Sequence, residues 1–377
     1  MLDAAFGKLV RDADVALNFK PVSVMDKPQV ADSGDKHDYL SLATYMWPDP
    51  NKPNGLPYIY RDGQTNPEVN TIQDANNFNN LIDTSCTLAL AYYFTGDEKY
   101  AEKASLLLRV WFLNPETRMN PNGTYAQVEK GHGIPIGTGI IDFREVARLG
   151  DCINLLDGAK MWTTNDQQAM KAWMDEFLTW LTTSKPGIFE SKMSNNHGTY
   201  YDTDIVALAL FIGKDDVARK VIEDAKVKRI AAQIEPDGTQ PQEIARTLSM
   251  TYSIFNLSAF ARLASLAERV GIDLWNFQTA DGRGIRKALD FLMPYIAGKE
   301  KWPYPQIRKL IGDWESFLAF PLYSQAGVKY SNPQYTELGL KVAREDVTRS
   351  RLLLILGSVL PTGSATLTPV PANTPRP

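Results

Sequence analysis

This sequence is poor in cysteine and histidine. Its 377 residues include two cysteines and three histidines. Two cysteines are too few for a disulfide framework, and Cys86 and Cys152 are not spaced like zinc ligands. We expect two buried free thiols, with a single disulfide as the alternative. Because His37, His132 and His197 are not paired at metal-ligand spacing, the sequence predicts no metal site and no other cofactor.

An excess of positive charge and long apolar runs are also missing. The 40 Lys and Arg residues are outnumbered by 44 Asp and Glu residues, which gives a net charge of −4. This balance argues against nucleic acid as a partner. No apolar run is long enough to cross a bilayer, so no membrane partner is expected. The N-terminus lacks an export signal. We expect either an intracellular protein or, as the favoured interpretation, a secreted or periplasmic one whose signal peptide is absent from this sequence.

Several common enzyme motifs are absent as well. The sequence contains no Gly-x-Ser-x-Gly elbow, Walker loop, dinucleotide-binding fingerprint or His-Glu-x-x-His motif. The composition is otherwise that of a soluble globular protein, with 44% apolar and 22% charged residues. Serine hydrolases, nucleotide-binding enzymes and metalloproteases are therefore disfavoured.

Two segments of the chain resemble each other and predict the fold. Residues 88–98 and 206–216 each read as an apolar helix, then a glycine, Gly96 or Gly213, and then an acidic start to an amphipathic second helix. A helix that is apolar all round must be buried, and an amphipathic partner can cover it. Repeated hairpins of this kind predict an all-α fold, an (α/α) toroid forming an incomplete barrel of roughly six or seven helical hairpins.

The remaining chain divides into helices, irregular stretches and a tail. The expected single catalytic domain covers residues 1–357, and a flexible Pro- and Thr-rich tail covers residues 358–377. Thr239 and Gln242 fit a capping box, with Pro241 in the first turn of a helix over 240–268. Further helices are expected at 3–19, 139–157, 165–183, 281–297, 307–323 and 335–349. Residues 36–74, 114–138 and 298–306 read as long loops, which are often functional.

Two stretches carry side chains suited to chemistry. The first, Asn195-Asn196-His197, precedes the buried helix 205–212 and has a structural alternative as a helix cap. The second carries Arg246 and Tyr252, which would not share a face of one straight helix at about 100° per residue. Its structural alternative is an Arg246–Glu243 ion pair beside a core tyrosine.

These two stretches together resemble the alginate lyase superfamily of polysaccharide lyases, whose members fold as α/α toroids. The likeness lies in Asn-Asn-His followed by Arg246-Thr-Leu-Ser-x-x-Tyr252-Ser-x-Phe-Asn-Leu. Residues 39–50 and 55–63 extend it, so that it covers most of the chain, and the nearest group is polysaccharide lyase family 38, which includes alginate and glucuronan lyases. The resemblance implies that Asn196, His197, Arg246 and Tyr252 form the catalytic group.

The chemistry of such a group would be β-elimination on a uronate. The C5 proton lies α to a carboxylate whose charge must be neutralised, and Asn196 and His197 are suitable donors, each worth about 3–4 kcal/mol. Arg246 would add positive potential and lower the pKa of Tyr252 from about 10. In β-D-mannuronate and β-D-glucuronate, H5 and O4 lie on one side of the ring, so Tyr252 could serve as both base and acid in a syn elimination. For guluronate, His197 would be the likelier base.

Loop residues around this centre are candidates for binding an acidic polysaccharide, the expected partner. Aromatic rings stack on sugar faces, and polar side chains donate to carboxylates, although each position has ordinary loop packing as its alternative. The candidate substrate-binding residues are Tyr45, Trp47, His132, Asn195, Tyr304 and Gln306.

The predicted function is a metal-independent polysaccharide lyase acting on a 1,4-linked polyuronate, with mannuronate-rich alginate favoured. A glucuronan lyase of the same mechanism and a non-catalytic uronan-binding protein remain alternatives. A glycoside hydrolase would need two carboxylates flanking the bond. Its candidates are Asp202, Asp204, Glu235, Asp237 and Glu243, and nothing in their spacing singles out a pair.

Overall fold

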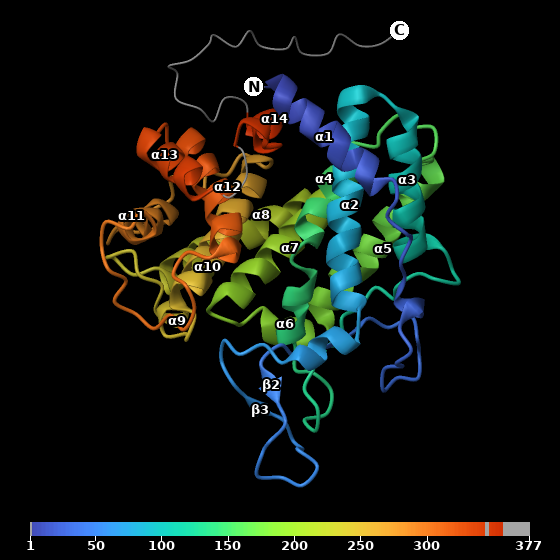
Figure 1. Cartoon of the computed structure of the whole chain (residues 1–377), viewed down its shortest axis with the longest axis horizontal. Coiled ribbons are helices and arrows are strands. Elements are labelled where there is room, and N and C mark those ends of the chain that lie inside the picture. The colour runs from blue at the N-terminus through green and yellow to red at the C-terminus, as the bar shows by residue number, and fades with distance from the viewer. Residues whose placement is uncertain (1, 344–346, 357–377) are drawn as a thin grey trace.

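A row of inner helices forms the centre of the protein, seen in a computed structural model that describes residues 2–343 and 347–356 (Figure 1). Neighbouring members of this row pack directly against each other. In spatial order they are α2 (Asp74–Thr95), α4 (Val146–Asn154), α7 (Asn196–Ile212), α10 (Ser249–Glu268) and α12 (Asp313–Lys329). Nearly every residue of α7 is buried, as expected for a helix covered on all sides.

Outer helices cover this row. The helix α3 (Glu98–Leu108) packs on α2, both α5 (Thr164–Thr183) and α8 (Asp215–Ala225) pack on α7, and α13 (Pro333–Val342) packs on α12. The helix α11 (Ile285–Ile296) contacts α10 and α13. From α12 the contacts return to α2 through two short terminal elements, α14 (Leu352–Leu356) and α1 (Leu2–Ala16), the latter also holding η6 (Val347–Arg349). The arrangement is the predicted incomplete α/α toroid.

Two of the three predicted long loops, 36–74 and 114–138, gather at one end of the toroid, at the bottom of Figure 1. Strand β1 (Leu40–Leu42) pairs in parallel with β4 (Tyr125–Val128), and β2 (Met46–Trp47) pairs antiparallel with β3 (Ile59–Tyr60). Short helical elements complete this end: η1 (Val24–Asp26), η2 (Pro67–Thr71), η4 (Thr138–Phe143) and α6 (Lys185–Glu190). The N-termini of α7 and α10 lie near these loops, which therefore wall one mouth of the toroid.

The two resembling segments form the hairpins that the sequence predicts. Gly96 ends α2 with φ 68° and Gly213 ends α7 with φ 81°, both in the left-handed region where glycine carries no Cβ penalty. Each outer helix then runs on into a π-helical segment, η3 (Arg109–Leu113) after α3 and η5 (Lys226–Ala231) after α8. The amphipathic second helices expected at 100–112 and 217–230 therefore end in π-helical rather than α-helical turns.

The helix expected over 240–268 is broken, which corrects the prediction. The structure has a short α9 (Pro241–Ile244), an irregular stretch at 245–248, and then α10. Thr239 donates its hydroxyl to Asp237 and does not cap a helix. Leu248 forms a β-bridge with Gln306, and this pairing with a distant segment competes with helical hydrogen bonding.

Other boundaries also shift from their predicted positions. The helix expected at 139–157 starts as the 3-10 segment η4, the one expected at 307–323 starts only at Asp313, and the one expected at 335–349 ends at Val342. The predicted tail at 358–377 lies outside the described residues. Within the part of the chain that is described, no helix is both long and apolar enough to cross a membrane.

The expectation of two free thiols is wrong. Cys86 on α2 and Cys152 on α4 form a disulfide, with their Cα atoms 4.9 Å apart. Their separation of 66 positions hides this proximity in the sequence, and it arises because α2 and α4 are neighbours in the inner row. Closing a loop of this length is typically worth about 2–4 kcal/mol.

Candidate active site

A cleft of about 580 Å³ opens at the loop end of the toroid. Its walls come from the loops around β1 to β4, from the start of α7 and from the start of α10. Asn196, His197, Arg246 and Tyr252, the side chains of the predicted catalytic group, all line it. The structure therefore brings together residues that the sequence separates by up to 56 positions.

The start of α7 positions Asn196 and His197. Asn195 is the N-cap, and its side-chain oxygen accepts the backbone N–H of His197 at 3.2 Å. The preceding turn is held by Arg229 of η5, which donates to the carbonyls of Ser191 and Met193 and pairs with buried Asp202 at 2.8 Å. The structural alternative of a helix cap thus holds for Asn195, while its two successors face the cleft.

His197 is held by a buried carboxylate. Its Nδ1 lies 2.7 Å from Oε1 of Glu190, the last residue of α6, whose side chain is 1% exposed. Burial on its own would lower the pKa of His197, but the charge and the hydrogen bond of Glu190 outweigh it, so the pKa is raised above its ordinary value of 6.5. The raised pKa extends the protonated form to higher pH, and in that form Nε2 carries a hydrogen that can be donated.

Asn196 is engaged with a second buried carboxylate. Glu243 accepts hydrogen bonds from the backbone N–H of Asn196 at 2.6 Å and from its Nδ2 at 2.9 Å and 3.1 Å. Burial raises the pKa of Glu243 to about 7, although the hydrogen bonds from Asn196 act in the opposite direction. The side-chain donor of Asn196, which we expected to face a substrate carboxylate, is directed at Glu243 in this structure.

Arg246 does not pair with Glu243 as its structural alternative supposed. Its Nε and Nη2 donate to Oδ1 of Asp62 at 2.9 Å and 2.5 Å, and Nη2 also donates to the hydroxyl of Tyr60 at 3.0 Å. The guanidinium carbon lies 3.7 Å from the ring centroid of Tyr252. The break at 245–248 makes this possible, because Arg246 precedes α10 and is not bound to its helical spacing.

The same break is fixed by a loop crossing close beside it. Asp62 also accepts from the backbone N–H and the hydroxyl of Thr247 at 2.8 Å and 2.9 Å. Gly63 has φ 71°, and a Cβ there would approach the Thr247 hydroxyl to 2.6 Å. The chain therefore needs a glycine at this point for two reasons, its backbone conformation and the close approach.

Tyr252 donates its hydroxyl to that of Tyr45 at 2.7 Å. Burial and the neighbouring Tyr45 raise the pKa of Tyr252, while Arg246 acts to lower it and is outweighed. This corrects the expectation that Arg246 brings the pKa below its ordinary value. Asp62 neutralises much of the arginine's field, because its carboxylate is in direct contact with the guanidinium.

The candidate substrate-binding residues fall into two groups. Tyr45 and Asn195 line the cleft. The others have local partners and lie outside its lining: Trp47 donates to the carbonyl of Gln64, His132 Nε2 lies 2.7 Å from the carbonyl oxygen of Tyr58, Tyr304 packs on Trp302, and Gln306 bonds to Met250 and Thr251. For these four, loop packing is what the structure shows.

Several cleft residues were not singled out from the sequence. Gln127, Asp142 and Arg144 line the cleft, and the Gln127 amide donates to Asp142 at 2.7 Å. Gln127 has φ 53°, a conformation that is uncommon outside glycine and recurs at functional sites. The expectation that loop 114–138 is functional was the available signal for Gln127. For Tyr60 and Asp62 the signal was the family-like segment 55–63.

The five carboxylates considered for a hydrolase do not flank the cleft. Asp202 pairs with Arg229, Glu243 with Asn196, Glu235 with Arg283, and Asp237 with Thr239, while Asp204 is buried. Within the described residues, the carboxylates that line the cleft are Glu129 and Asp142. Asp142 already accepts hydrogen bonds from Tyr39, Ser41 and Gln127.

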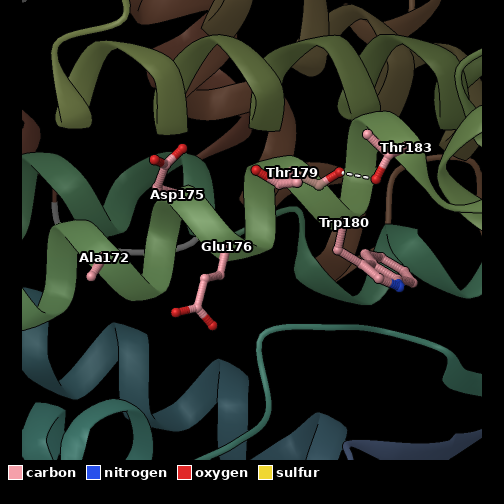
Figure 2. A pocket seen from close by; sticks show the side chains of 6 residues that line it. All are labelled: Ala172, Asp175, Glu176, Thr179, Trp180 and Thr183. Atoms are coloured by element: carbon pink, nitrogen blue, oxygen red, sulfur yellow. Dashed lines mark hydrogen bonds between the residues drawn. The ribbon is translucent and has the colours of Figure 1, made fainter.

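A separate hollow on the outer face of α5 has none of these features (Figure 2). Asp175 and Glu176 point to opposite sides of the helix, and Asp175 pairs with Lys214. The Thr183 hydroxyl donates within the helix to the carbonyl of Thr179 at 2.6 Å. This hollow is a surface groove along successive turns of α5. The side chains of the predicted catalytic group lie in the cleft instead.

Comparisons with known proteins agree with the architecture. Residues 23–302 match the family model described as alginate lyase. An alginate lyase from Bacteroides ovatus is 42% identical with a TM-score of 0.89, over 94% of this chain and 93% of that one. Alginate lyase A1-III from Sphingomonas species A1 is 16% identical with a TM-score of 0.51, over 87% and 88%.

A variant of A1-III in complex with a tetrasaccharide is 15% identical with a TM-score of 0.57, over 88% of this chain and 89% of that one. At these low identities, the likeness to the two A1-III structures shows the fold alone. Among curated proteins, none matched the chain.

Proposed function

The chain belongs to the alginate lyase family and is a polysaccharide lyase, and from that premise we propose that it cleaves a 1,4-linked polyuronate, preferably mannuronate-rich alginate, by syn β-elimination. The observation that carries the proposal is the shared cleft: Asn196, His197, Arg246 and Tyr252 line one cavity although they come from separate segments. The tetrasaccharide bound to the A1-III variant supports an oligosaccharide as the ligand type.

His197 acts as a donor in this proposal. Its Nδ1 is engaged by Glu190, and its pKa is raised, so Nε2–H is available to a substrate carboxylate. A protonated imidazole is a poor base, which disfavours the guluronate route in which His197 would remove H5. This argument favours mannuronate or glucuronate, where one residue can serve both proton transfers.

Tyr252 is the proposed base and acid. Its resting phenol gives its proton to the hydroxyl of Tyr45, 2.7 Å away, and Tyr45 releases its own proton toward solvent. The Tyr252 phenolate then takes H5, and the electron pair spreads into the carboxylate held by His197. The C4–O4 bond breaks, the Tyr252 proton goes to O4, and a C4=C5 double bond remains. Arg246, stacked on the ring, is the cation placed to stabilise the phenolate.

The positioning of Asn196 changes its proposed role. With its Nδ2 directed at Glu243, Asn196 fixes the first turn of α7 and the carboxylate behind it. One of its two amide hydrogens can still turn to a substrate, because both bonds run to the same carboxylate. Asn196 thus supports His197 and contributes a donor only when substrate occupies the cleft.

A panel of polymannuronate, polyguluronate and glucuronan tests the proposal. We expect a rise in ultraviolet absorbance from the conjugated C4=C5 bond, fastest on polymannuronate and unchanged by a metal chelator. Because the pKa of Tyr252 is raised, the rate should climb with pH as the phenolate becomes accessible, and then fall once His197 loses its proton. A fastest rate on glucuronan would identify the alternative substrate. Binding to every uronan without turnover would indicate a non-catalytic binding protein.

The disulfide bears on where the protein is located. A disulfide between Cys86 and Cys152 persists in oxidising compartments and is rare in the cytosol of most organisms. This supports the proposal that the protein is secreted or periplasmic, where it would meet an extracellular acidic polysaccharide. Measuring free thiols in protein taken from its native compartment tests it, and two reactive thiols would contradict it.

A further inference from the structure

A second cavity, which we term the seam cavity, adjoins the cleft inside the toroid. It has a volume of about 780 Å³, within the usual range for ligand pockets of about 300–1,000 Å³. It lies where α12 and the segment 350–355 meet the start of α4 and the middle of α10. Arg144, Phe255 and Trp314 line both the cleft and the seam cavity, so the two hollows share a wall and adjoin at its edge.

The seam cavity is rich in guanidinium groups although the chain is acidic overall. Arg144, Arg148, Arg262 and Arg351 line it. Glu145 is shared by three of them, at 3.8 Å from Arg144, 3.1 Å from Arg148 and 3.7 Å from Arg262. One carboxylate cannot satisfy three guanidinium groups, each of which carries five N–H donors.

The other charged residues of the lining do not balance this excess of positive charge. Asp83 pairs with Arg148 at 3.0 Å and lies toward solvent, with 62% of its side chain exposed. Arg351 donates to the hydroxyl of Thr87 at 2.9 Å, and Asp313 is the remaining carboxylate of the described lining. Four cations thus face three carboxylates in a chain whose net charge is −4. The lining therefore carries an excess of one positive charge, which favours an anionic ligand.

Two exposed aromatic residues of the seam-cavity lining, Trp314 and Phe317, form what we call the aromatic platform. Trp314 and Phe317 lie on successive positions of one face of α12, with ring centroids 5.7 Å apart and planes at 22°. They are 45% and 65% exposed, unusual for large aromatic residues. Flat, exposed rings suit stacking on the apolar face of a sugar ring. Trp314 also lines the cleft, so a chain leaving the cleft meets this platform first.

We propose that the seam cavity is a second saccharide-binding site, which holds carboxylate-bearing sugars of the same acidic chain beyond those in the cleft. The inference rests on the proposed function for the type of polysaccharide. The platform stacks a sugar ring, and Arg148, Arg262 and Arg351 bind the carboxylates of the units that follow. Longer chains therefore bind more tightly than chains that fill the cleft alone.

The test measures binding, so that it does not depend on turnover. Full-length protein carrying Tyr252→Phe is titrated with a mannuronate trisaccharide, a mannuronate hexasaccharide and a carboxyl-reduced, neutral hexasaccharide, followed by calorimetry and tryptophan fluorescence. We expect the acidic hexasaccharide to bind about tenfold more tightly than the trisaccharide, and the neutral one to lose that gain. Equal affinities for the two acidic oligosaccharides would overturn the proposal.

Substitutions test whether the tighter binding of the acidic hexasaccharide comes from the seam cavity. The double variant Arg148→Gln, Arg351→Gln should weaken hexasaccharide binding about fivefold and trisaccharide binding much less. The matched control, Lys220→Gln with Lys228→Gln, removes the same charge from exposed positions on α8 and η5. An equal loss in both double variants would also refute the site. If the arginine variant unfolds, Trp314→Ala provides the second measurement, since it should lower hexasaccharide affinity and abolish the fluorescence change.

Failure of this proposal is distinguishable from failure of the proposed function. A lyase without the second site would still produce the ultraviolet signal from polymannuronate while showing no dependence of affinity on chain length. A protein that binds the hexasaccharide through the seam cavity but never yields unsaturated products would retain the site and lose the function.

Discussion

The hairpins α2–α3 and α7–α8 share a plan but differ at one end. In both, an apolar inner helix ends at a left-handed glycine, an outer helix follows, and a π-helical segment closes the repeat. An arginine in each π segment binds a carboxylate, Arg109 to Asp166 and Arg229 to Asp202. The two hairpins are therefore alike at their glycine turns and in the segments that close them.

Their N-terminal ends serve different purposes. The first residue of α2, Asp74, is fully buried, pairs with Lys27 at 2.9 Å and accepts the backbone N–H of Leu40 at 3.0 Å. The first residues of α7, Asn196 and His197, meet two buried carboxylates and face the cleft. The comparison shows that the start of α2 anchors a loop through a buried ion pair. The start of α7 instead leaves hydrogen-bond donors available to a ligand.

The strongest test of this division is the proposed proton carrier near α7. Tyr252→Phe should lower kcat on polymannuronate by a factor of about 10²–10⁴ with the fold intact, because the phenol oxygen performs both transfers. Initial rates of ultraviolet absorbance and circular dichroism are the measurements. Tyr335→Phe on α13, which removes a hydroxyl bound to Asp290, is the matched control. Substantial turnover by Tyr252→Phe would remove the tyrosine from its role.

The α2 end should respond in the opposite way. Asp74→Asn leaves the buried Lys27 ammonium without its counter-charge, which should cost about 3–5 kcal/mol of unfolding free energy. The activity of the remaining folded protein should stay close to that of the parent. Urea denaturation together with kcat at low temperature checks both statements. A fall in kcat without a loss of stability would show that α2 also serves the reaction.

The pairing of Glu190 with His197 gives a smaller effect with a distinctive signature. His197→Ala should lower kcat by about 10²–10³ through loss of a donor to the developing charge. Glu190→Gln should cost less, because its amide oxygen still accepts from Nδ1. Removing the negative charge lowers the pKa of His197, so the pH at which activity falls through loss of the imidazolium should move down. An unchanged pH profile would show that Glu190 only fills space.

Glu243, the buried carboxylate that binds Asn196, should make the free energy of unfolding depend on pH. Burial raises the pKa of Glu243 from 4.5 to about 7, so its stabilising contribution is complete below pH 4.5 and is lost as the pH rises to about 7. The loss amounts to about 3 kcal/mol at most. Glu243→Gln should flatten this part of the curve of unfolding free energy against pH. Parallel curves for parent and variant would contradict the assignment.

Local patterns in the sequence were sufficient for the toroid. Apolar runs, Gly96 and Gly213 predict the hairpins because these features act within one helix and its cap. The break at 245–248 was not predictable in this way. It depends on Asp62 and Gln306, which lie far away in the chain, and the helical propensity of the segment gives no sign of them.

The candidate site was predictable in part for the same reason. The family-like motifs indicate Asn196, His197, Arg246 and Tyr252, and all four line the cleft. Their partners Glu190 and Glu243 look in the sequence like ordinary acidic residues. Only packing reveals that both are buried, and burial is what changes the pKa values around them.

The hydrogen bonds of Arg246 and Thr247 with Asp62 have a consequence for the order in which the protein folds. These hydrogen bonds join residues 184 and 185 positions apart, so they can form only after the segment 245–248 has been synthesised. Contacts of such long range form slowly during folding. The hairpin α2–α3 can collapse early on its own local contacts, while the arginine waits for its loop. We therefore expect the helical hairpins to form before the cleft acquires the geometry that catalysis requires.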